Sequence, residues 1–377
     1  MTTIGVLGGG QLGRMLALAG YPLGLRFRFL DPAPESPAEQ LAERLAFDFE
    51  NTTYLDTFVA GLDLVTYEFE NVPVRLARAL ERALPVFPPP AALEASQERL
   101  AEKALFQRLG LPTAPFAPVD TRQDLERALP AVGLPAVLKT RRFGYDGKGQ
   151  FVLRHPGDVG PAWRTLGGVP LLLEGFIPFQ REVSQIAVRG RDGSVVFYPL
   201  VENHHRDGIL RLSLAPAPGL TPDLQAQASD YAGRVLHALD YVGVLAIEFF
   251  QHDGRLIANE MAPRVHNSGH WTIEGAETSQ FENHLRAMLG LPLGSTEAVS
   301  PCALINLIGT LPEPRAVLAI PGAHLHLYGK TPRPGRKLGH VTLRTPAWEV
   351  LHERLAQVQG VTGLDPVPVR PSGRAWP

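Results

Sequence analysis

The pattern of apolar and polar positions at the N-terminus predicts a strand, a turn, a helix and a second strand. An apolar run from Ile4 to Leu7 precedes three glycines, a helical pattern covers Gln11 to Ala19, and a second apolar run covers Leu25 to Leu30. A short apolar run, a glycine turn and an amphipathic segment in this order are typical of a βαβ unit. The chain is therefore expected to begin with a Rossmann-like domain.

The rest of the first domain repeats this alternation and ends at a run of prolines. We expect a strand at 62–66, a helix at 75–83 and a short strand at 85–87. Three consecutive prolines at 88–90 cannot continue either kind of element. A helical pattern over 92–110 then stops at a glycine, which indicates a linker helix that enters a second domain.

Strand patterns dominate the middle of the chain. Short apolar runs separated by glycine turns predict an α+β module with a mobile hairpin, with strands at 136–139, 150–153, 171–174 and 182–188. After a predicted helix at 224–239, the runs 244–250 and 255–261 are joined through Asp253 and Gly254. An Asp-Gly pair between two such runs is a strong signal for a β-hairpin.

The C-terminal part returns to strands, at 303–308 and 324–328, followed by a basic turn and a helix at 348–359. The domain boundaries expected from these patterns are 1–92 for the Rossmann-like domain, 93–298 for the second domain with a lid at about 115–190, and 299–377 for a small β-rich domain. The fold class is thus α/β combined with α+β.

Composition and charge exclude several classes of protein. Of the 377 residues, 45% are hydrophobic and 20% are charged, and the net charge of −2 argues against broad binding to nucleic acid or to an anionic membrane. The single cysteine, Cys302, excludes an intrachain disulfide framework. No apolar run approaches the roughly 18 residues that a membrane span needs, so a cytoplasmic location is expected.

The N-terminal glycine turn has more than one interpretation. Gly8, Gly10 and Gly13 form the pattern G-x-G-x-x-G between a strand and a helix, and Asp31 closes the next strand. Taken alone, this arrangement indicates a nicotinamide-dependent dehydrogenase. Since unobstructed backbone N–H groups beside a helix N-terminus would hold any phosphate, a substrate phosphate is the favoured ligand, and a purely structural turn is the other alternative.

A lysine at the end of a strand and a glycine-rich loop suggest an ATP site. Lys139 ends an apolar strand, and three glycines within six residues, Gly144, Gly147 and Gly149, form a pliable loop whose N–H groups can surround phosphates. The spacing does not fit a Walker A loop, which disfavours a P-loop NTPase. A solvated hairpin turn is the alternative for the loop alone.

The strand 171–174 ends at Glu174 and opens into irregular backbone at Gly175, Phe176 and Ile177. Such backbone could present a carbonyl and an N–H to the edge of an adenine ring. Glu182 follows and could bind the ribose hydroxyls.

The strongest chemical signal is the pair of acids in the predicted hairpin. If Glu248 and Glu260 pair directly or diagonally, both lie on one face with their Cβ atoms roughly 5–8 Å apart, whereas a register shifted by one residue would separate them onto opposite faces. Two like charges so close within apolar runs are costly unless a cation lies between them, and oxygen ligands beside nucleotide phosphates indicate Mg²⁺. Asn259 could add a further oxygen. A solvent-facing strand with incidental acids is the alternative.

Together these features resemble the ATP-grasp superfamily, in which an N-terminal Rossmann-like domain precedes a lysine strand, a glycine-rich lid, an adenine hinge and two metal-binding carboxylates. Four stretches make a closer match to the N5-carboxyaminoimidazole ribonucleotide synthase family: GGGQLGRM at 8–15, GYDGKGQ at 144–150, NEMAPRVHNSGHWT at 259–272 and RPGRKLGH at 333–340. The resemblance extends to about residue 345. Phe143 departs from it, since many relatives have a glycine there, and this could stiffen the lid.

The resemblance implies roles for individual residues. It assigns ATP to Arg99, Lys139, Gly144, Tyr145, Asp146, Gly147, Lys148, Gly149, Gln150, Glu174, Gly175, Phe176, Ile177, Glu182, His205, Asn259 and Glu260. It assigns Mg²⁺ to Glu248 and Glu260. It places the imidazole ribonucleotide and the reacting carboxylate near Gly10, Gln11, Leu12, Tyr145, Arg264, His266, Asn267, Ser268, Lys330 and Arg336.

The activity that the resemblance implies is ATP-dependent carboxylation of 5-aminoimidazole ribonucleotide by bicarbonate, through carboxyphosphate, in a homodimeric enzyme. The expected catalytic residues are Lys139, which neutralises phosphate charge, Arg264, which holds the carboxylate, and either Asp146 or His266, which accepts the amine proton. The other hypotheses are a formate-using ribonucleotide ligase, biotin carboxylase, a nicotinamide-dependent dehydrogenase and a non-catalytic nucleotide-binding regulator.

Three groups of these residues also have plainer interpretations. Arg99 could lie on the solvated face of a helix, and His205 could belong to a surface turn. Lys330 and Arg336 could belong to an exposed basic loop.

Overall fold

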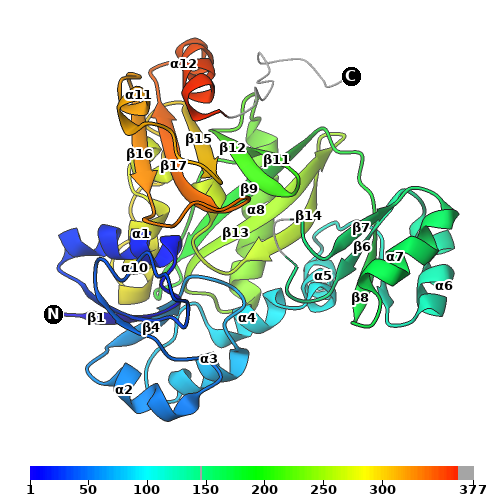
Figure 1. Cartoon of the computed structure of the whole chain (residues 1–377), viewed down its shortest axis with the longest axis horizontal. Helices are drawn as coiled ribbons and strands as arrows, with labels where there is room; N and C mark the ends of the chain where they lie inside the picture. Colours follow the sequence, from blue (N-terminus) through cyan, green and yellow to red (C-terminus); the bar gives the residue numbers. More distant parts are fainter. Residues whose placement is uncertain (145–146, 364–377) are drawn as a thin grey trace.

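The structure, a computed structural model, describes residues 1–144 and 147–363. Within these ranges the strands form three sheets, of four, nine and four strands. Figure 1 shows the first four-stranded sheet in blue at the lower left, the nine-stranded sheet through the centre, and the second four-stranded sheet in a separate lobe at the right. The three sheets surround the region where the predicted site residues converge.

The N-terminal domain is built on a parallel sheet in the order β3-β2-β1-β4. It confirms the predicted βαβ unit, because β1 and β2 pair in parallel across α1. The strand expected at 85–87 is reduced to a single parallel bridge between Val65 and Val86. Its elements are β1 (Thr3–Leu7), α1 (Gln11–Gly20), η1 (Tyr21–Leu23), β2 (Arg26–Leu30), β3 (Glu43–Leu45), η2 (Thr52–Tyr54), α2 (Leu55–Val59), β4 (Leu64–Tyr67) and α3 (Val74–Glu81).

The single linker helix expected over 92–110 is two helices, α4 (Pro90–Ser96) and α5 (Arg99–Arg108). The break occurs at Glu98, whose backbone is extended and whose side chain accepts a hydrogen bond from the N–H of Ala101 at 2.8 Å. An acidic N-cap satisfies a free N–H of the new helix, so a second helix starts here with its own direction.

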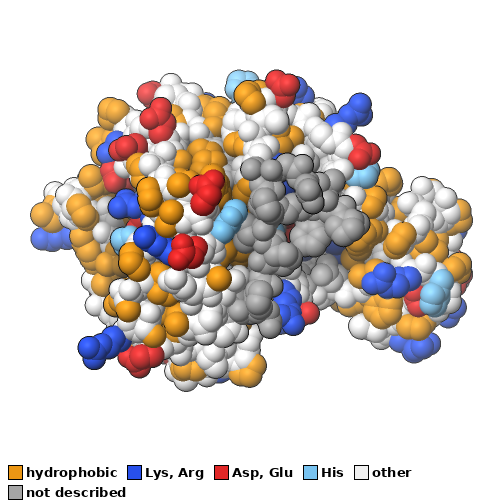
Figure 2. All heavy atoms as spheres, turned by 90° about the horizontal axis from the view of Figure 1, so that it is seen from above, with side chains coloured by type: hydrophobic (Ala, Val, Ile, Leu, Met, Phe, Trp, Pro, Cys, Tyr) orange, Lys and Arg blue, Asp and Glu red, His pale blue; other side chains and the backbone are white. Residues whose placement is uncertain are grey.

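The lobe at the right of Figures 1 and 2 is a small antiparallel sheet in the order β5-β8-β6-β7, with two helices packed on it. Its sheet ends at residue 175, and the following strand, β9 (Arg181–Arg189), belongs to the central sheet, so the lobe is shorter than the lid expected at about 115–190. Its elements are β5 (Phe116–Val119), α6 (Arg122–Val132), β6 (Ala136–Thr140), β7 (Gln150–Leu153), η3 (Pro156–Asp158), α7 (Val159–Leu166) and β8 (Leu171–Gly175).

The central sheet runs β14-β13-β9-β11-β12-β15-β17-β16, and β10 also pairs with β9. The strands of the C-terminal segment therefore continue this sheet and do not form a sheet of their own. Beside β9, the sheet and its helices comprise β10 (Val195–Phe197), β11 (Val201–Arg206), β12 (Ile209–Ala215), α8 (Pro222–Ala238), β13 (Gly243–His252), β14 (Arg255–Ala262), η4 (Asn267–Gly269), α9 (Thr272–Gly275), α10 (Gln280–Leu289), β15 (Cys302–Ile308), α11 (Pro314–Leu318), β16 (Ala323–Leu327), β17 (Lys337–Arg344) and α12 (Trp348–Thr362).

Helices cover both faces of the sheet along part of β9 and β13, which explains the uninterrupted apolar runs at 186–188 and 244–247. Leu245 and Ile247 belong to a core cluster with residues of α8, whereas Val244 and Ala246 belong to a cluster with residues of α10. The second cluster also contains Leu16 of α1, so α10 joins the N-terminal domain to the central sheet. Among the described residues, no helix combines the length and the apolarity that a membrane span requires.

Candidate functional site

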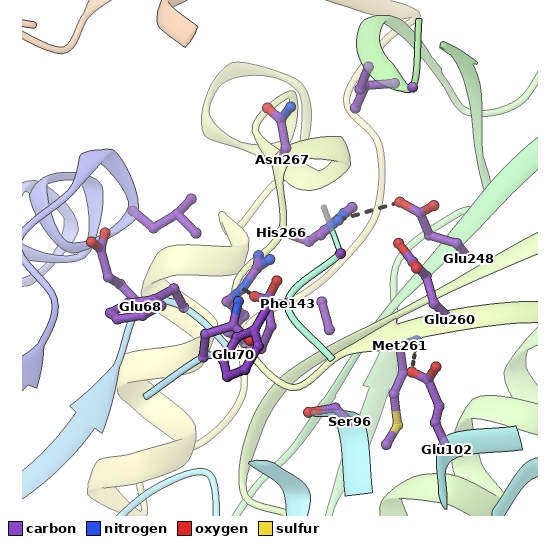
Figure 3. A pocket seen from close by; sticks show the side chains of 18 of the residues that line it. Glu68, Glu70, Ser96, Glu102, Phe143, Glu248, Glu260, Met261, His266 and Asn267 are labelled. Atoms are coloured by element: carbon purple, nitrogen blue, oxygen red, sulfur yellow. Dashed lines mark hydrogen bonds and ion pairs between the residues drawn. The ribbon is translucent and has the colours of Figure 1, made fainter. Parts of the chain in front are cut away.

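A cavity of about 410 Å³ lies where the N-terminal domain, the glycine-rich loop and the central sheet meet. Figure 3 shows labelled side chains entering it from several directions. The following sequence-predicted residues line it: Gln11, Leu12, Arg99, Gly144, His205, Glu248, Glu260, Arg264, His266 and Asn267. The structure thus brings together residues separated by more than 200 positions, as the resemblance implied.

The β13–β14 hairpin places the two predicted metal ligands opposite each other. Asp253 and Gly254 form the turn with positive φ values of 48° and 73°, as expected of a tight hairpin turn that begins with Asp-Gly. The register pairs Glu248 with Glu260 and Phe249 with Ala258. Asn259 is consequently the extra residue of a β-bulge, and Figure 3 shows the two carboxylates side by side on adjacent strands.

Different neighbours give the two carboxylates different affinities for protons. Burial and the nearby charge of Glu260 raise the pKa of Glu248, although His205 acts in the opposite direction. Burial would also raise the pKa of Glu260, but the guanidinium of Arg99, 2.9 Å from its Oε2 atom, outweighs this and lowers it. The pair is thus held by cations of the protein itself.

The donor set fits Mg²⁺ bound together with nucleotide phosphates. Within 1–144 and 147–363 no cluster of three or more His, Cys, Asp or Glu side chains could hold a metal by itself, so further ligands would have to be phosphate oxygens or water. The buried Oδ1 atom of Asn259 has no hydrogen-bond partner among the described residues, and buried polar atoms are rarely left in this state. A carbonyl oxygen without a partner, on the residue next to Glu260 in the sequence, is one that a cation would satisfy.

Lys139 and a second lysine share one buried carboxylate. Nζ of Lys139 donates to Oε2 of Glu174 at 2.5 Å, and Lys103 of α5 pairs with the other oxygen. Burial would raise the pKa of Glu174, but the two ammonium groups lower it to about 2. Glu174 is thus an anion that fixes both lysines at the base of the small lobe.

The hinge after β8 is partly engaged by internal hydrogen bonds. The N–H of Phe176 donates to the carbonyl of Pro135 at 3.0 Å, and the carbonyl of Ile177 accepts from the N–H of Phe179 at 2.9 Å. The predicted ribose ligand Glu182 accepts a hydrogen bond at Oε2 from Nδ1 of His205 at 3.0 Å. Burial would lower the pKa of His205, but Glu182 raises it to about 9.

Arg264 and His266 follow β14 and enter the cavity. Arg264 pairs with Glu70 of the N-terminal domain and also donates to the carbonyl of Val265 at 3.0 Å. His266 lies with Nε2 3.4 Å from Oε1 of Glu248 and with Nδ1 2.8 Å from Oγ of Ser268, a fully buried side chain. Burial and the charge of Arg264 lower the pKa of His266 to about 3, so the ring is neutral.

The glycine turn differs from the prediction in one respect. The N–H of Gly9 donates to Asp31 at 2.9 Å, and the N–H groups of Gly10 and Gly13 both donate to Glu68. The prediction of unobstructed N–H groups is therefore wrong for Gly10, because a buried acid of the protein already accepts its hydrogen. Asp31 likewise serves this turn, which removes the main support for a dinucleotide ribose contact.

The basic turn contacts the N-terminal domain. Lys330 donates to the side chain of Gln11, a residue that lines the cavity. Arg336 pairs with Glu35 at 2.6 Å, and Thr331 donates to the same carboxylate at 2.7 Å. The two parts of the chain predicted to share a phosphate are adjacent, and the alternative of an isolated exposed loop does not hold.

The remaining predicted residues fall into two groups. Tyr145 and Asp146 lie outside the described residues. Gly147, Lys148, Gly149 and Gln150 are described but do not line the cavity, and neither do Lys139, Glu174 and the hinge residues Gly175, Phe176 and Ile177.

Sequence reasoning missed several charged residues of the site. Glu68 and Glu70 directly follow the buried strand β4, and this acid-x-acid pattern at a strand end was the available signal. Glu102 and Lys103 lie one turn beyond Arg99 on α5, and Glu102 accepts from the N–H of Met261 at 2.7 Å. Their helical spacing resembles a solvated face, so only the packing of α5 against β14 reveals them.

Comparison with known proteins agrees with this arrangement. The chain matches a ribonucleotide synthetase preATP-grasp domain over residues 1–97, an ATP-grasp domain over 104–281, and a phosphoribosylaminoimidazole carboxylase C-terminal domain over 302–354. These three matches cover most of the described chain in the order of its structural parts.

Relatives of known identity cover nearly the whole chain. It is 56% identical over 358 residues to N5-carboxyaminoimidazole ribonucleotide synthase of Pseudomonas aeruginosa, covering 95% of this chain and 99% of that one. The crystal structure of the corresponding synthetase from Thermus thermophilus is 60% identical, with a TM-score of 0.93 over 97% of this chain and 100% of that one.

A synthase from Aspergillus clavatus, solved with ADP and 5-aminoimidazole ribonucleotide, is 32% identical, with a TM-score of 0.88 over 96% of this chain and 98% of that one. The chain is therefore a member of the N5-carboxyaminoimidazole ribonucleotide synthase family of ATP-grasp ligases.

Proposed function

We propose that this protein uses ATP and bicarbonate to carboxylate the amine of 5-aminoimidazole ribonucleotide, giving the N5-carboxyamino product, ADP and phosphate in purine biosynthesis. The observation that carries the proposal is the position of Glu248 and Glu260, which face the same cavity as Arg264 and His266. Nucleotide and carboxylate chemistry can therefore share one enclosed space.

The protein's own residues provide the charge balance for phosphate transfer. Glu248, Glu260 and Asn259 would hold Mg²⁺, which would neutralise charge on the phosphates. Lys139, whose ammonium group is held by Glu174, would neutralise charge on the phosphates. Attack of a bicarbonate oxygen on the γ-phosphorus would break the bond to the β–γ bridging oxygen and give carboxyphosphate and ADP.

Arg264 would hold the oxygens of the carboxyl group during its transfer to the exocyclic amine. Its guanidinium is fixed by Glu70, so its direction is set before the substrate binds. Cleavage of the C–O bond of carboxyphosphate would release phosphate and give CO₂, and the amine would attack CO₂ to form the new C–N bond with loss of one proton. Water must be excluded because carboxyphosphate hydrolyses readily.

The deciding experiment measures ADP release with and without 5-aminoimidazole ribonucleotide. ADP release that depends strongly on this nucleotide and on bicarbonate is expected. Equal rates with and without the nucleotide would overturn the assignment, and activity with formate in place of bicarbonate would favour the formate-using ligase. Binding of NAD(P)H without ATP turnover would favour the dehydrogenase.

The proposed oligomeric state is a homodimer, and the proposed location of the protein is the cytoplasm. Size-exclusion chromatography with light scattering tests the first part: a mass twice that of the 41.0 kDa chain is expected, and a monomer would contradict it.

A further inference from the structure

A row of buried polar side chains crosses the central sheet and ends at His266. Oγ of Ser213 donates to Oδ1 of Asn203 at 2.7 Å, Nδ2 of Asn203 donates to Oγ of Ser184 at 3.0 Å, and Oγ of Ser184 donates to Oγ of Ser268 at 2.7 Å. Ser184, Ser213 and Ser268 are fully buried and Asn203 nearly so. A buried polar row of this kind destabilises the folded protein unless every polar atom in it has a hydrogen-bond partner.

The row belongs to the same face of the sheet as the candidate metal ligands. The register pairs Ser213 with Asn203 between β12 and β11, and pairs Ser184 with Glu248 between β9 and β13. Directly paired residues project to the same face of a sheet. The row therefore approaches the cavity beside Glu248, and η4 adds Ser268 at its end.

The direction of the last hydrogen bond is settled by a backbone group. The N–H of Ser268 donates to Nδ1 of His266 at 3.3 Å, and a backbone N–H can only donate. Nδ1 must then be an acceptor, so Oγ of Ser268, 2.8 Å away, donates to it as well. Oγ of Ser268 is left to accept from Ser184, which agrees with the direction of every other bond in the row.

A neutral imidazole whose Nδ1 accepts carries its hydrogen on Nε2. Nε2 is the atom that lies 3.4 Å from Oε1 of Glu248, and Figure 3 shows the ring of His266 directed toward that carboxylate. The hydrogen of His266 therefore faces the cavity, while its lone pair faces the buried row.

We propose that Ser213, Asn203, Ser184 and Ser268 are positioning residues that hold His266 as a hydrogen-bond donor, through Nε2, to an oxygen of the carboxyl group that is transferred. The proposal rests on the proposed function for the identity of that oxygen. Of the two candidates for the proton acceptor, it excludes His266, because Nε2 already carries a hydrogen and Nδ1 already accepts two. A fixed donor aimed at developing negative charge acts without reorganisation during the reaction.

The tautomer can be measured directly in the full-length enzyme without substrates. The protein is labelled with ¹⁵N-histidine, the ring nitrogens are observed by NMR, and the spectrum of His266→Gln identifies the signals of His266. An unprotonated Nδ1 and a protonated Nε2 are expected. The reverse tautomer would overturn the proposal, whatever the substrates of the enzyme prove to be.

Variants of the row test whether it acts through His266. Ser184→Ala should lower kcat by about tenfold, equivalent to the loss of one modest hydrogen bond in the transition state, while the KM for ATP changes less than twofold. It should also shift the ring signals of His266 toward a mixture of tautomers. Ser184→Thr, which keeps the hydroxyl, should restore both.

Thr342→Val is the matched control, because Thr342 is a fully buried hydroxyl residue of the same sheet outside the row. Its kcat should be unchanged. If Ser184→Ala lowers only the melting temperature and leaves kcat and the ring signals unchanged, the row is structural and the proposal is wrong. If Ser184→Ala does not fold, Ser213→Ala at the far end of the row answers the same question by the same two measurements.

Discussion

Glu248 and Glu260 lie directly opposite each other across β13 and β14, and the irregularity in this hairpin begins at the next pair. Two carboxylates in this position repel each other. Arg99 contacts Glu260 and His266 approaches Glu248, so side chains of the protein that could also contact substrate offset the repulsion.

Replacing either acid should abolish turnover while preserving the fold. Glu248→Gln and Glu260→Gln keep the shape of the side chain but remove the charge that would hold Mg²⁺. A fall in kcat of at least about a hundredfold is expected, the order of magnitude for loss of one preorganised electrostatic group. Steady-state kinetics at several Mg²⁺ concentrations measure it. The exposed Glu297→Gln is the control, and near-normal activity in either site variant would contradict the metal assignment.

The β13–β14 hairpin shows which features could be predicted from the sequence and which could not. The apolar runs and the Asp-Gly turn predicted both strands, and the structure confirms them. At the turn, however, His252 pairs with Arg255, a register that would place Glu248 and Glu260 on opposite faces if it continued. The bulge at Asn259 brings them onto one face, and a bulge depends on tertiary packing that no local pattern reveals.

Lys103 should be needed for both stability and ATP binding. It is fully buried against Glu174, so Lys103→Met leaves that carboxylate with Lys139 as its remaining ionic partner. Removing one member of a buried ion pair typically costs about 3–5 kcal/mol of stability. Urea denaturation measures this loss, and nucleotide titration should show weaker ATP binding because Lys139 must then stay with Glu174.

Adding Glu174→Gln to Lys103→Met provides the control for this interpretation. The double variant removes the unpaired negative charge, so it should recover part of the lost stability. A double variant less stable than Lys103→Met would show that Lys103 stabilises the fold by packing alone.

The basic turn should determine affinity for the ribonucleotide and not for ATP. Arg336→Ala removes a cation next to the N-terminal domain, and its effect on the KM for the ribonucleotide should correspond to about 1.5–3 kcal/mol, the range for a lost charge-assisted contact. Arg333→Ala, an exposed arginine of the same turn, is the control and should leave both KM values unchanged. A raised KM for ATP alone would place these cations at the wrong end of the site.

The glycine turn at 8–13 was predicted correctly as a turn between a strand and a helix, but the groups that its N–H groups bind were only partly predicted. The glycine spacing predicted the strand, turn and helix, because glycine is required where Glu68 and the backbone approach closely. It could not show that Glu68, 55 residues beyond Gly13, accepts the N–H groups of Gly10 and Gly13. Contacts between residues so far apart depend on the sheet order, which the local pattern does not encode.

His284 joins the N-terminal domain to the central sheet and should make stability depend on pH. Its Nε2 lies 3.0 Å from Oγ1 of Thr66 in β4, and its Nδ1 accepts from the N–H of Val244 in β13 at 3.0 Å. The side chain is fully buried, and burial lowers its pKa to about 3 from the usual value of about 6.5. The folded protein therefore keeps this imidazole neutral at pH values where the unfolded chain would bind a proton.

The sign of the effect follows from this difference in proton binding. Above about pH 6.5 the ring of His284 is neutral in both the folded and the unfolded protein, so it contributes no pH dependence. As the pH falls from about 6.5 toward about 3, the unfolded chain takes up a proton that the folded protein does not. The free energy of unfolding therefore falls by at most about 1.4 kcal/mol per pH unit. The free energy of unfolding is measured by urea denaturation at pH 8 and at intervals down to pH 5. It should decline less steeply with falling pH in His284→Gln than in the unaltered protein. At pH 8 the variant should nevertheless be the less stable of the two, because it loses the hydrogen bonds of His284. His237→Gln, an exposed histidine on α8, should reproduce the unaltered slope. Equal slopes for all three proteins would show that His284 does not couple the two domains to pH.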